Sequence, residues 1–309
     1  MPFVVVFFWM AAALFAGAAV EVREDDRAIE VWSNDKMVLR YHKTESPVPE
    51  GVPKLYRRSG YIHPVLTPDG TEVTGDFPED HLHQHALFMA WTSGKYGDKK
   101  LDFWNQKKEE GRVAHKRVVS KISSDKRAEF VVELSHFDQA DPETEIIRET
   151  WKVTVHLFGE DDHFVFDIES SQLRVGNRPF TVEKNRYGGM ALRGNAAWLG
   201  SDACEFRTSE GKEREAGNHT RPNWVEMAGE IDGEFASIVV FGHPDNFRAP
   251  QTVRIHPEKP YFCFAPMVEG RFSIGSERPF VSRYRYLVSR KRVDKDFIEK
   301  HWKLYSALR

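Results

Sequence analysis

Three histidines recur at every second position of the segment His81-Leu82-His83-Gln84-His85, the most informative stretch of the chain. On a β-strand this spacing directs all three imidazoles to one face. Imidazoles titrate near neutral pH, so such a cluster can bind hydroxyl groups and act as general acid or base. His63 and several acidic residues lie nearby in the sequence. The clustering favours a functional site over a set of hydrogen-bonded structural histidines.

A metal site is a second interpretation of the same residues. Alternating imidazoles on one strand can bind a transition metal through two nitrogens, at His81 and His83, with Asp80 or Asp102 completing the site. Calcium is not expected, because its protein ligands are oxygen atoms. We expect no cofactor, and a transition metal at His81 and His83 is the alternative.

Period-two patterns predict the strands that must position these residues. The apolar run 87–91 is typical of a strand entering the core, and apolar and polar side chains alternate clearly over 145–157. Further strands are predicted at 29–33, 37–42, 128–137, 163–169, 179–183, 235–241, 252–256, 261–265 and 280–288. Many strands and few helical stretches indicate an all-β, antiparallel fold.

The C-terminus is the exception to this pattern. Asp294 can cap a helix, and apolar residues from Phe297 to Leu308 recur at helical spacing. We therefore expect a short C-terminal helix that lays one face on the β-body. The chain has no internal repeat or low-complexity linker, so residues 20–309 are predicted to form a single β-sandwich domain.

The N-terminus has the pattern of an export signal. Residues 2–20 are uncharged and end in small residues, which predicts a signal peptide over 1–19. No basic residue precedes the apolar run, and its length is close to that of a membrane span, so a retained N-terminal anchor is the alternative. Either way, the protein is expected to be exported, as a periplasmic or secreted protein.

Composition excludes several classes of protein. A formal net charge of −3 provides no overall field for nucleic acid or for an anionic membrane surface. A mean hydropathy of −0.54 excludes a protein with several membrane spans. Cys204 and Cys263 are the only cysteines, too few for a disulfide framework, and they are either buried thiols or one disulfide.

Four spaced motifs resemble the DUF6807 family, which also carries the label methane oxygenase PmoA. They are HPVLTPDGTEVTGDFPEDHLHQHALFMAW at 63–91, LDFWN at 101–105, YGGMALRG at 187–194 and GHPDNFRAP at 242–250. Ala86 departs from the family pattern, which has Gly there. Methane oxidation is not expected, because a particulate methane monooxygenase subunit is an integral membrane protein and this chain has at most one N-terminal span.

The layout also resembles the galactose-mutarotase-like β-supersandwich, with an early histidine-bearing strand, a long β-body and a last strand at 282–287. That fold implies a carbohydrate ligand in the concave face of one sheet, without fixing an activity. Sugar chemistry of this kind needs a carboxylate base and an imidazole that flank one sugar.

The resemblance suggests roles for particular residues. His81, His83 and His85 are the candidate catalytic imidazoles, and the candidate carboxylates are Glu183, Asp102 and Glu269. Candidate substrate-binding residues are His63, Trp104, Arg193, His243, Arg248 and Glu269. The two arginines could hold a hydroxyl pair or a uronate carboxylate, and Trp104 could stack on a sugar ring.

Three functions follow from these observations. The leading hypothesis is an exported carbohydrate-active enzyme, epimerase-like or lyase/hydrolase-like, that uses the histidine cluster and a carboxylate. A noncatalytic periplasmic carbohydrate-binding protein is the first alternative. A metal-dependent oxidoreductase, as the family label suggests, is the second.

Overall fold

The computed structural model describes residues 19–157 and 162–308. The predicted signal peptide or anchor over 1–19 lies outside the described residues except for Ala19. None of the helices within 19–157 and 162–308 has the length and hydropathy needed to span a bilayer.

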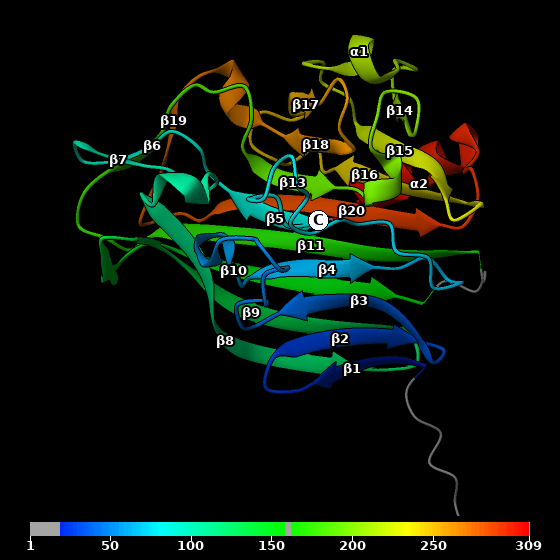
Figure 1. Ribbon diagram of the computed structural model, residues 1–309, viewed down its shortest axis with the longest axis horizontal. Coiled ribbons are helices and arrows are strands. Elements are labelled where there is room, and N and C mark those ends of the chain that lie inside the picture. Colours follow the sequence, from blue (N-terminus) through cyan, green and yellow to red (C-terminus); the bar gives the residue numbers. More distant parts are fainter. Residues whose placement is uncertain (1–18, 158–161, 309) are drawn as a thin grey trace, which may run out of the picture.

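Two eight-stranded antiparallel sheets lie face to face (Figure 1). The first sheet has the order β1 (Val20–Glu24), β2 (Ala28–Ser33), β3 (Lys36–His42), β4 (Tyr61–Val65), β5 (Leu87–Ala90), β13 (Gly189–Arg193), β18 (Tyr261–Phe264), β17 (Val253–Ile255). The second has the order β14 (Glu205–Thr208), β15 (Trp224–Ile231), β16 (Glu234–Gly242), β20 (Phe280–Ser289), β11 (His163–Arg174), β10 (Asp141–His156), β9 (Arg127–Asp138), β8 (Gly111–Ser123).

Smaller elements flank the sandwich. A four-stranded sheet has the order β19 (Phe272–Ile274), β12 (Phe180–Val182), β6 (Gly94–Tyr96), β7 (Lys99–Leu101). The α-helices are α1 (Arg214–Gly217) and α2 (Lys295–Ser306), and the 3-10 helices are η1 (Lys54–Tyr56), η2 (Gln106–Lys108), η3 (Ala196–Trp198) and η4 (Pro266–Glu269). The predicted antiparallel all-β sandwich with a short C-terminal helix is confirmed.

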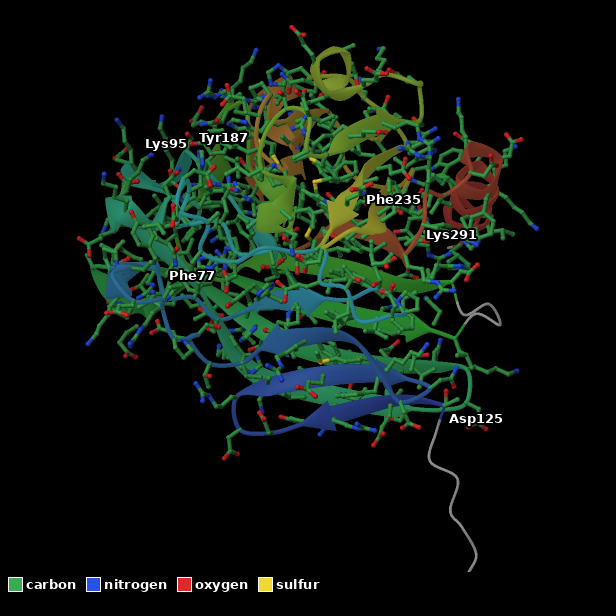
Figure 2. All side chains as sticks on the ribbon, turned by 45° about the vertical axis from the view of Figure 1, so that its right-hand side comes forward. Phe77, Lys95, Asp125, Tyr187, Phe235 and Lys291 are labelled. Atoms are coloured by element: carbon green, nitrogen blue, oxygen red, sulfur yellow. The ribbon has the colours of Figure 1, made fainter. Side chains whose placement is uncertain are left out.

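The strands predicted from alternating apolar and polar side chains and from the apolar run 87–91 are present, with ends that differ by a few residues, whereas the histidine segment 81–85 forms no strand. The alternation over 145–157 places Ile147, Glu149 and Trp151 in the interior, while Arg148 and Lys152 on the same strand are exposed. Side chains from both sheets fill the space between them (Figure 2). The short strands β6, β7 and β19 were not predicted, and neither were longer strands such as β8 and β15.

Helix α2 covers the outer face of the second sheet. The side chain of Asp294 accepts hydrogen bonds from the backbone N–H groups of Asp296 and Phe297, which is the predicted cap. The helix buries Ile298 and Tyr305 against Val165, Trp224, Val239, Phe241, Leu287 and Val293. Residues of the second sheet with the opposite parity, such as Phe166 and Tyr286, face the inter-sheet core instead.

Glu149 is an ionisable residue inside the sandwich, and it is fully buried. Its carboxylate accepts hydrogen bonds from His136 Nε2 (2.7 Å), Trp151 Nε1 (2.7 Å) and Ser170 Oγ (2.5 Å). Burial raises the pKa of Glu149, but the hydrogen bonds, that from His136 foremost, outweigh burial and hold this pKa below its usual value. The network joins β9, β10 and β11 across the second sheet.

Removal of this carboxylate is expected to be strongly destabilising. Glu149→Ala would leave the His136, Trp151 and Ser170 donors without their acceptor inside the core, and the free energy of unfolding should fall by about 3–5 kcal/mol. Urea denaturation measures this change. Glu143→Ala, at an exposed position on the same strand, is the control and should change stability by less than about 0.5 kcal/mol. Equal stabilities of the two variants would contradict the assigned role of the network.

Candidate functional site

The histidine segment does not form the strand that its spacing predicts. Residues 81–83 lie in turns, and only His85 forms an isolated β-bridge, to Asp76. The rings of His81 and His83 are neighbours, with centroids 5.6 Å apart in an edge-to-face arrangement. His85 lies apart from them and is fully buried. The expectation that three imidazoles share one face is therefore wrong, because the turns break the two-residue period.

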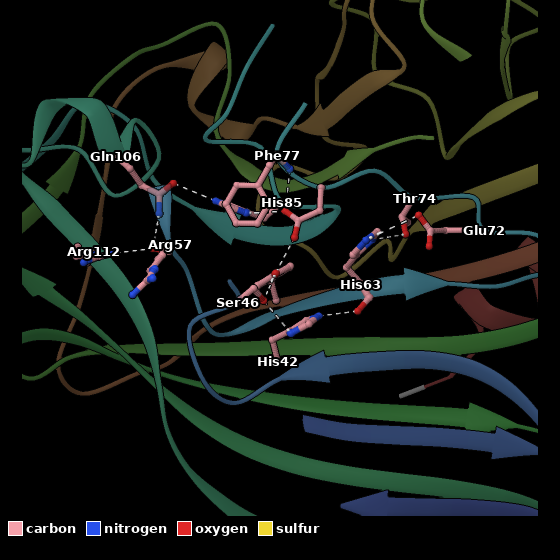
Figure 3. Close-up of polar contacts among 12 residues, drawn as sticks. His42, Ser46, Arg57, His63, Glu72, Thr74, Phe77, His85, Gln106 and Arg112 are labelled. Carbon is pink, nitrogen blue, oxygen red and sulfur yellow. Dashed lines mark hydrogen bonds and ion pairs between the residues drawn. The ribbon is translucent and has the colours of Figure 1, made fainter. Parts of the chain in front are cut away.

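His85 belongs to a buried hydrogen-bond chain (Figure 3). Its Nδ1 lies 2.8 Å from Asp76 Oδ1, and its Nε2 lies 3.0 Å from Gln106 Oε1. The second oxygen of Asp76 accepts a hydrogen bond from Tyr61, whose hydroxyl also contacts Ser46. Both ring nitrogens of His85 thus have protein partners. This ring fixes the loop that carries the other two histidines.

Ala86, which follows this ring, has a positive φ of 46°. Glycine adopts this left-handed conformation at lower cost than alanine, because a Cβ crowds the backbone there. The departure of Ala86 from the family's glycine therefore falls at a position where the backbone favours glycine.

His81 and His83 line a pocket of about 180 Å³. A pocket of this volume has room for a small ligand. The residues around the pocket are His81, His83, Gln84, Trp104, Asn105, Arg186, Tyr187, Arg254, His256 and Tyr261. They come from β17, from β18, from the loop between these two strands, and from the loops before β5, before η2 and before β13.

Strand pairing determines which side of the first sheet forms the pocket floor. Phe262 and Phe264 contact Phe206 and Tyr284 of the second sheet, so Tyr261, at the opposite parity of β18, points away from the inter-sheet core. Arg193 of β13 lies directly opposite Tyr261 in the register. The pocket therefore lies between the outer face of the first sheet and the loops that cover it.

Asp80 and His81 form a hydrogen-bonded pair at this pocket. His81 Nδ1 lies 3.0 Å from Asp80 Oδ2, and the His81 side chain is 33% exposed. Arg193, whose side chain is only 2% exposed, donates to both oxygens of Asp80 at 2.9 and 3.3 Å. Burial raises the pKa of Asp80, but the hydrogen bonds from Arg193 and His81 outweigh burial and hold this pKa far below its usual value. Asp80 is thus ionised and orients His81.

Two further histidines of the pocket are neutral at physiological pH. Burial, together with the proximity of His81 and His85, lowers the pKa of His83 to about 4. Burial, then the positive charge of Arg254 and the proximity of His81, lowers the pKa of His256 to about 4. The rings of His81 and His256 lie 5.8 Å apart in an edge-to-face arrangement. Neutral imidazoles can both donate hydrogen bonds to ligand hydroxyls and accept them.

Aromatic side chains make one wall of the pocket. Trp104 is 1% exposed and packs on Phe88 at a centroid distance of 4.6 Å. Its ring meets Tyr187 (labelled in Figure 2) and Tyr261 edge-to-face at 5.6 and 6.1 Å. The Tyr261 hydroxyl is buried and interacts with the Cys263 thiol. This wall combines apolar ring surface with a buried hydroxyl group.

Comparison with known proteins identifies the family. A family model described as "Family of unknown function (DUF6807)" matches residues 28–303. The chain belongs to the DUF6807 family. No curated protein matches the chain. The resemblance seen in the sequence motifs is therefore confirmed for nearly the whole described chain.

Solved structures that match this DUF6807 chain include galactose mutarotase-like proteins. A galactose mutarotase related enzyme from Lactobacillus acidophilus is 8% identical, with a TM-score of 0.39, and the match covers 89% of this chain and 99% of that one. A galactose mutarotase-like protein from Lactobacillus casei is 9% identical, with a TM-score of 0.40, covering 87% and 99%.

A third match is a heparan sulfate lyase from Pedobacter heparinus, 9% identical with a TM-score of 0.41, covering 90% of this chain and 36% of that one. At these identities and TM-scores, the likenesses assign neither a reaction nor a ligand to the DUF6807 chain.

The three predicted carboxylates do not line the pocket. Asp102 is 1% exposed and accepts hydrogen bonds from Asn105 and Lys108, as well as from the backbone N–H of Trp104. Glu183 pairs with Lys95 at 3.3 Å, and Glu269 accepts a hydrogen bond from Thr252. Asp80, which we considered only as a metal ligand, is the carboxylate that contacts a pocket histidine.

Four other predicted residues do not line the pocket and have partners within the protein. His63 contacts Thr74, and His243 lies 3.0 Å from the carbonyl oxygen of Leu308, just beyond α2. Arg248 donates to backbone carbonyl oxygens in the loop around η4. Arg193 lies beneath the pocket and donates hydrogen bonds to Asp80 and Gln84. Trp104 does line the pocket, although almost all of its ring surface is covered.

The pocket residues that were not predicted from the sequence are Gln84, Asn105, Arg186, Tyr187, Arg254, His256 and Tyr261. One signal for them was present. Arg254 and His256 alternate with buried Val253 and Ile255 around β17, so they share the polar face of a predicted strand. This period-two pattern was used to predict the strand but not to select candidate ligands.

The described residues do not favour the metal alternative. Among residues 19–157 and 162–308, no three His, Cys, Asp or Glu side chains lie close enough to hold one metal ion. His81 and His83 would therefore lack a third protein ligand. Cys204 and Cys263 are both buried free thiols, so the disulfide alternative is wrong.

Acidification is expected to destabilise the protein through His83. Its pKa of about 4 in the folded state lies below the value of about 6.5 in an unfolded chain, so the unfolded state binds more protons between these values. The free energy of unfolding should then fall as the pH drops through this range, by up to about 1.4 kcal/mol per pH unit for this residue.

Urea denaturation at several pH values between about 7 and 4 measures this slope. The slope should be shallower in His83→Gln than in the wild type, because glutamine does not titrate. Identical slopes for the two proteins would contradict the buried, neutral state of His83.

Proposed function

We propose that this DUF6807 member is a carbohydrate-active enzyme in which His81 transfers a proton to or from a sugar bound in the pocket. The observation that carries the proposal is the Asp80–His81 pair at the pocket, anchored from below by Arg193. A histidine that only stabilised the fold would not need a partly exposed ring beside a carboxylate held ionised by a buried arginine.

The pair defines which nitrogen of His81 does the chemistry. An ionised carboxylate 3.0 Å from Nδ1 favours the tautomer that carries its proton there, because that N–H then donates to Asp80. Nε2 is left as the nitrogen with a lone pair, available to a ligand. When Nε2 accepts a proton, Asp80 stabilises the positive charge of the resulting imidazolium.

The rest of the pocket suits a sugar. Hydroxyl groups find hydrogen-bond donors and acceptors here, on the neutral rings of His83 and His256 and on the side chains of Gln84 and Asn105. Tyr187 is partly exposed and offers apolar ring surface to the C–H groups of a sugar ring, and the buried rings of Trp104 and Tyr261 pack behind it. Burial raises the pKa of Tyr261 well above its usual value, so its hydroxyl stays protonated.

Epimerase-like, lyase-like and hydrolase-like reactions all use a base of this kind. In each, a proton leaves a C–H group, a hydroxyl group or a water molecule, and His81 Nε2 is the proposed acceptor.

Export to the periplasm or to the medium also stays a prediction, since the segment that carries it lies outside the described residues.

Substitution of His81 tests the proposal. Incubation with a panel of neutral and acidic mono- and oligosaccharides, with product analysis, should first identify a substrate of the wild type. His81→Ala should then lower its turnover by about 10²–10⁴-fold, because the proton acceptor is lost, while affinity changes by less than about tenfold. Asp80→Asn should lower kcat by at least about tenfold, with KM within about threefold.

His156→Gln is the matched control. His156 lies on β10 of the second sheet, outside the pocket lining, and its side chain is 25% exposed. Unchanged turnover in His81→Ala would refute the proposal. Saturable sugar binding by the wild type without any product would instead support the noncatalytic carbohydrate-binding alternative.

A further inference from the structure

The charges around the pocket are of one sign. Its lining includes two arginines, Arg186 and Arg254, and no aspartate or glutamate. The two carboxylates closest to its histidines are already paired, Asp80 with Arg193 and Asp102 with Lys108. His83 and His256 are neutral at physiological pH, so the two guanidinium groups set the charge of the pocket.

Arg254 is held in place by neutral acceptors. It lies on the edge strand β17, and its Nη1 donates to Asn218 Oδ1 at 3.1 Å and to the carbonyl oxygen of Ile255. Burial and the nearby positive charge of Arg186 both lower the pKa of Arg254. Neither arginine forms an ion pair with an acidic side chain in the part of the chain that the structure describes.

Arg186 completes the pair from a different element. It lies in the loop before β13, next to Tyr187, and its side chain is exposed. Two like charges that face the same small pocket repel each other, and a neutral ligand would leave that repulsion in place. An anionic group between the two arginines would offset this repulsion and could accept charge-assisted hydrogen bonds from both guanidinium groups.

We infer that the ligand of this pocket is a sugar that carries an anionic substituent, a carboxylate or a sulfate, bound by Arg186 and Arg254. This inference rests on the proposed function, since it names the class of sugar for the same pocket. It differs from the expectation that Arg193 and Arg248 would bind a uronate, because both of those side chains are engaged within the protein.

Calorimetric titration with matched sugars tests the inference. The pairs are galactose and galacturonate, glucose and glucuronate, and mannose and mannuronate, with galactose 6-sulfate as the sulfate arm. At least one acidic sugar should bind about tenfold or more tightly than its neutral partner, and this preference should shrink as salt is raised. The affinities of galacturonate and galactose 6-sulfate are then compared, and the sugar that binds more tightly shows whether the pocket prefers a carboxylate or a sulfate.

Variants assign the effect to the two arginines. Arg186→Gln and Arg254→Gln should each weaken acidic-sugar binding by about tenfold or more. The Arg186 side chain is exposed and donates no hydrogen bond within the described chain. Neutral-sugar binding should change by less than about twofold. Arg254→Lys keeps the positive charge but lacks the planar guanidinium group, so it should weaken acidic-sugar binding by an intermediate factor. Arg278→Gln, an exposed arginine outside the pocket lining, is the control and should change nothing.

The possible failures are distinguishable. Equal affinity for neutral and acidic partners, or acidic-sugar binding unchanged in both Arg186→Gln and Arg254→Gln, would overturn the inference and leave the proposed function standing. Absence of binding to every sugar tested would overturn both.

Discussion

The ion pair between Arg193 and Asp80 is the interaction on which the candidate site depends. Arg193 projects from β13 on the outer face of the first sheet, where a lone guanidinium would be costly to bury. Asp80, in the loop that covers this face, forms an ion pair with the guanidinium group and so compensates its buried charge. The same arginine also donates a hydrogen bond to Gln84. The pair therefore attaches the histidine loop to the sheet and, through Asp80, sets the orientation of His81.

A second buried ring supports the same loop from its other end. His85 contacts both Asp76, in the loop before β5, and Gln106, the first residue of η2. The short histidine segment thus contains two kinds of residue. His81 and His83 face a pocket and have room for a ligand, whereas His85 is a structural residue with both nitrogens engaged. The division follows from burial, since solvent can reach only the first two rings.

The site could be predicted from the sequence only in part. His81, His83 and Trp104 were chosen from a local cluster and an aromatic motif, and all three line the pocket. Asp102 was chosen for the same reason, but its oxygens are occupied by neighbouring donors in its own loop. The carboxylate that contacts a pocket histidine is instead Asp80, which directly precedes His81 in the sequence.

The sequence by itself determined the local structure, because strand periodicity, the Asp294 cap and the helical spacing after it depend on neighbouring residues only. The four DUF6807 motifs likewise identified the family. Only the tertiary structure decided the contents of the pocket. Arg193 meets Asp80 across 113 positions of the chain, and Arg254 joins them because β13, β18 and β17 pair in that order. Such contacts depend on which strands become neighbours, and local patterns do not encode that order.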